Sequence, residues 1–254
     1  MNSLKARTGW EWILNGLALF RKRPFFLTNL FFAYLVCMIL LSMIPFAGQI
    51  FPVLITPVFT FLFMQACFMI DEEEPVTFRE LFGILDRSVI LRLMSAGGCY
   101  LFFALLATGL SFLVEGGNLF SLFIRNEPDK LPVSGLGSMF IALGLIFAAY
   151  IPFAMAMWFV APLIGWKNMS LGKALFYSFF TVAREYRPFV VYMAGWIALG
   201  VLLPYLSATV LNIFFGQSVA TFIVFILSVV LSVWMYCSFY PTYRDIFGRP
   251  VTNR

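Results

Sequence analysis

The densest group of charged residues in the chain is the run Asp71-Glu72-Glu73-Glu74-Pro75. Carboxylate oxygens are the ligands that Ca²⁺ and Mg²⁺ prefer, so four acids in a row could hold a divalent cation. Adjacent side chains converge on one ion only where a tight turn directs them, and no Gly stands in this run to form one. We therefore expect a solvated loop whose carboxylates stabilise the start of the following helix, and cation binding stays an open alternative.

Few other residue types that carry chemistry are available. The chain has no His, so a mixed Cys/His zinc site cannot form. The four cysteines are far apart in the sequence and none forms a Cys-x-x-Cys pair: Cys37, Cys67, Cys99 and Cys237. A nucleophile with a base, an Asp pair or a metal set is what an intramembrane enzyme needs. We predict that the protein is not an enzyme and that it has no catalytic, cofactor-binding or metal-binding residues.

Long windows of the chain contain no Asp, Glu, Lys or Arg at all: 24–70, 93–114, 131–166 and 188–243. The surface of a water-soluble domain needs charges, and 62% of this chain is hydrophobic while only 11% is charged. A bilayer core about 30 Å thick takes about 20 apolar residues per helix. The sequence therefore predicts one polytopic all-α membrane domain over 1–254. Ion-coupled transporters place ionisable residues inside the membrane, and these windows hold none.

Turn residues divide the windows into six predicted transmembrane helices. Pro45 to Gln49 separates the first two, Glu115-Gly116-Gly117 ends the third, and 212–218 separates the last two. The predicted spans are about 25–44, 51–70, 93–114, 138–163, 189–210 and 219–240. The apolar run after Arg23 is too long for the core of a signal peptide, so we expect this segment to remain as an anchor.

The distribution of basic residues predicts the orientation. Of the 17 Lys and Arg residues, only Arg125 and Lys130 fall on one side of the six spans, and the other fifteen fall on the opposite side. Loops rich in Lys and Arg stay in the cytoplasm. We expect a multi-pass protein of the bacterial inner membrane with both termini in the cytoplasm. Because the basic residues lie near membrane boundaries, the pI of about 9.1 indicates anionic lipid rather than nucleic acid.

Three segments that lead into odd-numbered spans resemble one another. Thr8, Thr77 and Ser170 are each suited to an N-cap, and each precedes apolar residues at a spacing of three to four. This pattern predicts three amphipathic cytoplasmic helices of about 15 residues. Each helix would be followed by a transmembrane hairpin, which gives three parallel pseudo-repeats at about 1–70, 71–166 and 167–243.

Two segments carry a resemblance to known proteins: residues 170–180 (SLGKALFYSFF) leading into Arg187-Pro188-Phe189, and the stretch 16–26. They resemble bacterial inner-membrane proteins of the YciC type and the membrane domain attached to some glycerophosphodiester phosphodiesterases. The similarity in pattern spans most of the chain, and its motifs are short and degenerate. The resemblance implies a fold and a compartment and no substrate, since the phosphodiesterase's catalytic domain has no counterpart here.

Basic residues at the feet of two spans are the candidate binding residues: Arg21, Lys22, Arg23, Arg184 and Arg187. They could contact anionic lipid headgroups or serve only to set the topology. The segment from Glu115 to Ser134, with its apolar stretch 119–124, is a second candidate, as an external binding loop. We expect a non-enzymatic integral membrane protein that binds lipids and a membrane or cytoplasmic protein partner, as a scaffold or accessory factor. The alternative is a transporter or permease for a lipid-like or apolar small molecule.

Overall fold

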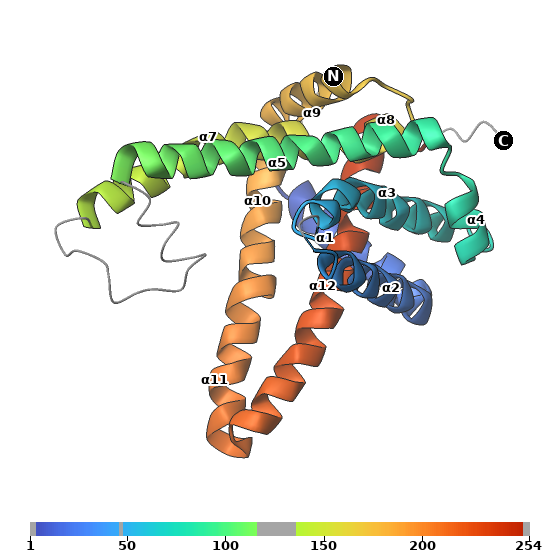
Figure 1. Cartoon of the computed structure of the whole chain (residues 1–254). Helices are drawn as coiled ribbons and strands as arrows, with labels where there is room; N and C mark the ends of the chain where they lie inside the picture. Colours follow the sequence, from blue (N-terminus) through green and yellow to red (C-terminus); the bar gives the residue numbers. More distant parts are fainter. Residues whose placement is uncertain (1–3, 46–47, 116–135, 251–254) are drawn as a thin grey trace.

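The computed structural model describes residues 4–45, 48–115 and 136–250, and the regular elements in these ranges are helical (Figure 1). Six helical segments within them are long and apolar enough to cross a bilayer, with mean hydropathy between 1.9 and 2.4. They are α2 (Pro24–Ser42), α3 (Phe51–Asp71), α5 (Arg87–Glu115), α7 (Leu136–Met157) with α8 (Val160–Gly165), α10 (Tyr186–Ile197) with η4 (Ala198–Leu202) and α11 (Leu203–Phe215), and α12 (Gln217–Phe247). The predicted all-α fold with six spans is confirmed.

Two spans are longer than predicted at their charged ends. Helix α5 begins at Arg87 rather than near residue 93, and α12 continues to Phe247 rather than ending near residue 240. The prediction stopped where the charge-free windows stopped. A helix that leaves the hydrocarbon keeps its own backbone hydrogen bonds, so charged side chains do not end it.

Two of the three predicted amphipathic helices are confirmed at about the expected length. Helix α1 (Thr8–Lys22) has 15 residues and α9 (Leu171–Arg184) has 14. The third, α4 (Phe78–Gly83), has only 6, so the prediction of about 15 residues is wrong there. The apolar pattern beyond it belongs to α5, because the chain turns after Gly83 and the span begins at Arg87. The relation among the three pseudo-repeats stays a prediction.

The three predicted N-caps differ in the structure. Thr77 forms a full capping box: its hydroxyl accepts the N–H of Glu80 at 3.4 Å, and the Glu80 carboxylate accepts the N–H of Thr77 at 3.1 Å. Ser170 stands at the cap of α9 in extended conformation, without a capping bond from its side chain. The prediction for Thr8 is wrong, because the preceding residue, Arg7, is the cap and Thr8 is already helical.

The fourth and fifth spans are interrupted helices. Helical geometry breaks at Trp158 and Phe159, between α7 and α8, and the buried hydroxyl of Ser178 in α9 bridges the break. This hydroxyl accepts the N–H of Phe159 at 2.9 Å and donates to the carbonyl of Met155 at 2.8 Å. In the fifth span the π-helical turn η4 ends at Leu202, two residues before Pro204, whose missing N–H disturbs the regular ladder of backbone hydrogen bonds.

The six spans form three transmembrane hairpins: α2 with α3, α5 with α7/α8, and α10/α11 with α12. The hairpins diverge from a common end of the molecule, here called the base. In Figure 1 helices α5 and α7 run across the view, whereas α10, α11 and α12 run down it. The inner half of α3 lies in the core of the base, and every residue from Pro57 to Ile70 except Thr60 is buried. The outer parts of the hairpins expose apolar side chains, as Leu113 at 85% and Ile213 at 76% show. Hydrocarbon rather than water suits such a surface.

Helix α1 packs closely against the bases of α10 and α12. A Cβ added to Gly9 would lie 2.0 Å from the carbonyl oxygen of Pro188, and one added to Gly16 would lie 2.6 Å from the Cα of Ser238. Between these two contacts Trp12 is fully buried, and its indole N–H donates to Asp245 at 3.0 Å. This amphipathic helix is therefore a part of the core and not a loose surface element.

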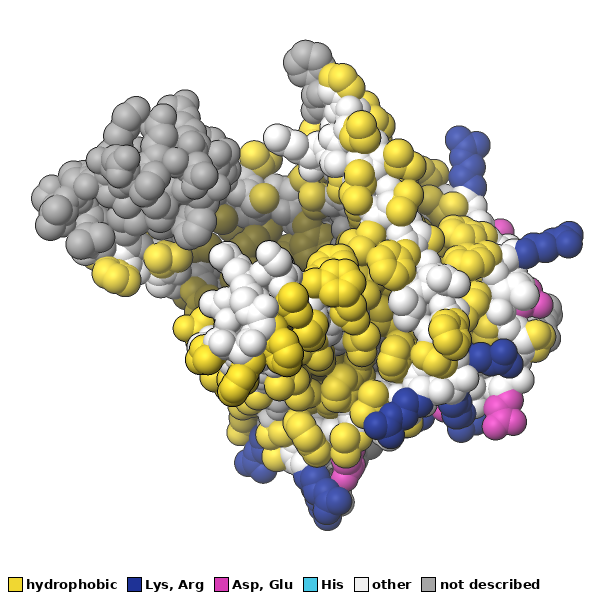
Figure 2. Space-filling model, turned by 90° about the horizontal axis from the view of Figure 1, so that it is seen from below, with side chains coloured by type: hydrophobic (Ala, Val, Ile, Leu, Met, Phe, Trp, Pro, Cys, Tyr) yellow, Lys and Arg dark blue, Asp and Glu magenta, His cyan; other side chains and the backbone are white. Residues whose placement is uncertain are grey.

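Lys and Arg side chains lie at the borders of the face of the molecule that Figure 2 shows. Figure 2 shows a broad apolar surface, and the Lys and Arg side chains visible on this face lie along its lower and right-hand borders. A boundary between an apolar face and a basic border fits the interface between the bilayer core and water. The predicted separation of charge from the spans is thus present in three dimensions.

Candidate functional site

Arg184 and Arg187 lie together at the foot of the fifth span. Helix α9 ends at Arg184 and α10 begins at Tyr186, so the two guanidinium groups flank one sharp connection. The connection encloses a small pocket of about 170 Å³. Its lining residues are Leu4, Arg184, Glu185, Tyr186, Arg187 and Pro188.

Both cations are accessible from the surface. The side chain of Arg184 is 55% exposed, and its Nε lies 3.5 Å from the carboxylate of Glu185. Glu185 itself is buried and accepts the backbone N–H of Leu4 at 2.8 Å, which fixes the amino-terminal segment against the connection. Arg187 donates to the hydroxyl of Tyr186 at 3.3 Å and is otherwise exposed. The arrangement offers two guanidinium groups to an anion at the membrane boundary.

Arg21, Lys22 and Arg23 form a second, separate basic group. They are exposed at the junction of α1 and α2, where Pro24 is the first residue of the span. The opposite end of α1 contacts Pro188, through Gly9. Because an α-helix rises about 1.5 Å per residue, the length of α1 puts roughly 20 Å between the two basic groups. The structure therefore brings together the residues within each group but does not unite the five.

The acidic run forms a partly exposed turn after α3, but its first two acids are paired with basic residues, which the sequence does not predict. Asp71 accepts from Arg244 at 3.3 Å and from the hydroxyl of Tyr240 at 3.2 Å, both on α12. Glu72 pairs with Arg249 at 2.7 Å. These pairings join the end of α3 to the carboxy-terminal segment. Within the described ranges no three His, Cys, Asp or Glu side chains cluster in a way that could hold a metal ion.

Buried polar side chains inside the spans tie helices to one another. Gln65 is 1% exposed and accepts the indole N–H of Trp166 at 2.6 Å. The hydroxyls of Tyr192 and Ser238 lie 2.6 Å apart, both side chains being buried. Packing explains these residues. Which of them are hydrogen-bond partners could not be predicted, because no local sequence pattern identifies the pairs.

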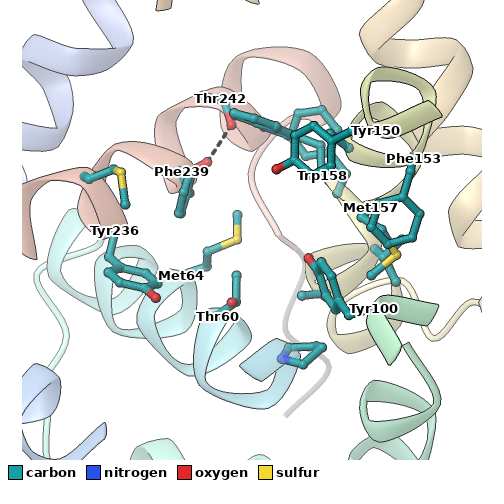
Figure 3. A pocket seen from close by; sticks show the side chains of 16 residues that line it. Thr60, Met64, Tyr100, Tyr150, Phe153, Met157, Trp158, Tyr236, Phe239 and Thr242 are labelled. Atoms are coloured by element: carbon teal, nitrogen blue, oxygen red, sulfur yellow. Dashed lines mark hydrogen bonds between the residues drawn. The ribbon is translucent and has the colours of Figure 1, made fainter. Parts of the chain in front are cut away.

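A larger cavity of about 270 Å³ lies where three hairpins meet (Figure 3). Helix α3 supplies one wall, α5 and the α7/α8 break supply a second, and α12 supplies the third. The lining residues are Pro57, Thr60, Met64, Tyr100, Tyr150, Phe153, Ala154, Met157, Trp158, Phe159, Val160, Ala161, Met235, Tyr236, Phe239 and Thr242. None of them carries a charge. Sequence reasoning does not find this cavity, since its walls come from four distant segments.

The external segment that the sequence places between Glu115 and Ser134 lies almost entirely outside the described residues. Its apolar stretch 119–124, Arg125 and Lys130 are among these. The role of this segment as a binding loop therefore stays a prediction.

Comparison with known proteins shows one extended similarity. The chain is 31% identical over 250 residues to a probable inner membrane protein of Burkholderia thailandensis, covering 96% of this chain and 93% of the relative. No protein-family model matches the chain, and no solved structure matches it significantly. Similarity at this level over nearly the whole of both chains, together with the six apolar helices, shows common descent. The chain therefore belongs to the family of bacterial inner membrane proteins that includes this Burkholderia protein.

Proposed function

We propose that the protein binds anionic lipid headgroups at the cytoplasmic rim of the inner membrane and acts there as a non-enzymatic scaffold or accessory factor. The observation that carries this proposal is the pair Arg184 and Arg187 beside one small pocket at the foot of a span. A basic residue at this depth gains on the order of 1 kcal/mol from anionic headgroups. The exposed group from Arg21 to Arg23 supplies a second contact at the foot of α2.

Both termini are cytoplasmic in this proposal. Fifteen of the 17 basic residues fall on the side of the spans that carries the termini, and Arg125 and Lys130 fall on the other. This bias matches the retention of Lys and Arg in the cytoplasm. The likeness to the YciC type and to the phosphodiesterase membrane domain belongs to the same proposal, and the order of short helix and hairpin supports it.

The residues available support a role without catalysis. The chain has no His. Three of the acids on the side that carries the termini have basic partners: Asp71 with Arg244, Glu72 with Arg249, and Glu185 with Arg184. A carboxylate held in an ion pair is a poor general base. We expect purified protein to show no turnover in a screen of hydrolase and transferase substrates.

Replacing both Arg184 and Arg187 by Gln should weaken binding of phosphatidylglycerol. Two contacts of about 1 kcal/mol each predict a loss of roughly tenfold to thirtyfold in affinity. Native mass spectrometry of detergent-purified protein titrated with phosphatidylglycerol measures this, with zwitterionic phosphatidylethanolamine as the reference lipid. The matched control replaces Arg79 and Lys173, which are exposed and lie outside the pocket, by Gln. Equal losses in the two double variants would contradict the proposal.

A transporter for an apolar small molecule is the second candidate function. It is favoured by the 270 Å³ cavity between hairpins, by the interrupted span α7/α8 that lines this cavity, and by the second interrupted span, α10/α11. Broken helices allow one part of a span to move against another. Protein-dependent movement of a fluorescent phospholipid across proteoliposomes would favour this function. Movement no faster than in empty vesicles, with a protein partner retained after mild detergent extraction, would favour the scaffold.

A further inference from the structure

We propose that the cavity between α3, α5, α7/α8 and α12 is a binding site for one acyl chain, whose carbonyl oxygen accepts a hydrogen bond from Tyr100. This site is distinct from the Arg184/Arg187 pocket, which is lined by other residues. Binding of an acyl chain in the cavity therefore does not depend on binding of headgroups at the rim.

The size of the cavity argues that something fills it. At about 270 Å³ it has the volume of about nine water molecules in the liquid. Close-packed protein interiors leave few voids larger than one water molecule. A space of this size, bounded by the buried half of α3 and open on the side of Tyr150, can be filled by a molecule from the surrounding medium.

The chemistry of the walls favours an apolar occupant over water. Most of the lining is aromatic, aliphatic or thioether side chain, and no lining residue is charged. The two threonines use their hydroxyls within their own helices, since Thr60 donates to Thr56 at 3.0 Å and Thr242 donates to Phe239 at 2.7 Å. Buried water needs two to four polar partners per molecule. Beyond the threonines the lining side chains offer only the hydroxyls of Tyr100, Tyr150 and Tyr236, which are too few partners for about nine waters.

Three tyrosine hydroxyls lie in the lining, those of Tyr100, Tyr150 and Tyr236, and Tyr100 supplies the polar contact proposed here. Figure 3 shows its hydroxyl directed toward the open centre of the cavity. The ring of Phe153 packs against the Tyr100 ring in an edge-to-face contact, with 5.5 Å between the ring centroids. Among the described residues this hydroxyl makes no hydrogen bond. A partly buried phenol donor in this position suits a carbonyl acceptor on the ligand.

The surroundings of the cavity supply the ligand. The hairpins that bound it diverge toward the hydrocarbon, and Tyr150 at its edge is 49% exposed. In a bilayer the medium next to such an opening consists of lipid chains. An ester-linked phospholipid chain and a free fatty acid share the required chemistry, a flexible apolar chain with one carbonyl group.

Quenching of tryptophan fluorescence by bromine-labelled chains tests the site, because Trp158 is part of its wall. The purified full-length protein in maltoside micelles is titrated with dibromostearic acid and, separately, with a phospholipid that carries one dibromostearoyl chain. Bromine quenches on contact, so an occupied site gives a saturable phase at one chain per protein, and this phase disappears in Trp158→Phe. Saturation by one probe and not the other identifies the source of the chain.

Two variants separate ligand binding from folding. Tyr100→Phe keeps the volume and removes the donor, so we expect affinity to fall about fivefold, as for one hydrogen bond. Ala154→Leu fills the cavity and should abolish the saturable phase, whereas Ala148→Leu on the exposed side of α7 should preserve it. Quenching that rises without saturation, or that is identical in wild type, Tyr100→Phe and Ala154→Leu, would overturn the proposal.

Discussion

Gly97→Ala is expected to lower the melting temperature of the protein by roughly 3–10 °C, because α5 and α3 touch backbone to backbone at this position. A Cβ added to Gly97 would lie 2.5 Å from both the Cα and the carbonyl oxygen of Leu54. Neither of those atoms can rotate away as a side-chain tip could. The two spans must separate, and overpacking of this kind costs about 1–3 kcal/mol. Circular dichroism of the protein in detergent during heating measures the shift.

The neighbouring residue provides the control. A Cβ on Gly98 meets no atom within 4 Å. Gly98→Ala is thus the same chemical change one residue further along the same helix, and it should leave the melting temperature unchanged or slightly raised. If the two variants melted alike, the close contact between α3 and α5 would be wrong.

Arg244→Gln is expected to destabilise the protein by about 1–3 kcal/mol, through the loss of the charged hydrogen bond that joins α3 to α12. The Arg244 side chain is 25% exposed and donates to Asp71, which is 15% exposed, at 3.3 Å. Without Arg244, the hydroxyl of Tyr240, at 3.2 Å, is the hydrogen-bond partner that the described residues leave to the Asp71 carboxylate. A mostly buried carboxylate that has lost its cation costs more than the broken bond alone.

A double-mutant cycle isolates this pair. Asp71→Asn and Arg244→Gln together should cost less than the sum of the single variants, because the second substitution removes a charge that the first had left unpaired. The reference pair is Arg7 and Glu11, which lie 3.1 Å apart with side chains 86% and 47% exposed and should contribute little. Strictly additive effects of the Asp71 and Arg244 substitutions, measured by unfolding in mixed micelles, would show that the two do not interact.

The membrane-spanning elements could be predicted because hydropathy is a local property. The predicted span 51–70 is α3 at Phe51–Asp71, and the predicted span 25–44 is α2 at Pro24–Ser42. A chain in hydrocarbon must satisfy its backbone within the helix, so an apolar run of sufficient length leaves no alternative. The amphipathic α1 and α9 followed from the spacing of their apolar residues for the same reason.

The contacts that assemble the base could not be predicted in this way. Asp71 and Arg244 are 173 residues apart, and a loop position alone indicated solvent for the acid. The Ser178 hydroxyl gives no local sign that it will bridge the break at Phe159, 19 residues earlier in the chain. The cavity could not be predicted either, because its walls meet only after the three hairpins have packed.

The candidate binding residues could be predicted in part. The sequence indicated Arg184 and Arg187 by their place at the foot of a span, which is where the structure has them. It did not indicate that Glu185 would be buried between them and hold the backbone of Leu4 at 2.8 Å. Charge at a membrane boundary is visible in a sequence, whereas the pocket around it depends on tertiary contacts.

Reporter fusions in a bacterial host test whether the protein has six spans with its basic side and both ends in the cytoplasm. Alkaline phosphatase, active only in the periplasm, and a green fluorescent protein, fluorescent only in the cytoplasm, are fused separately after Gly48, Asp86, Gly216 and Arg254. We predict phosphatase activity after Gly48 and Gly216, and fluorescence after Asp86 and Arg254. The inverse pattern, or fluorescence at all four positions from a chain that stays soluble without detergent, would contradict the account.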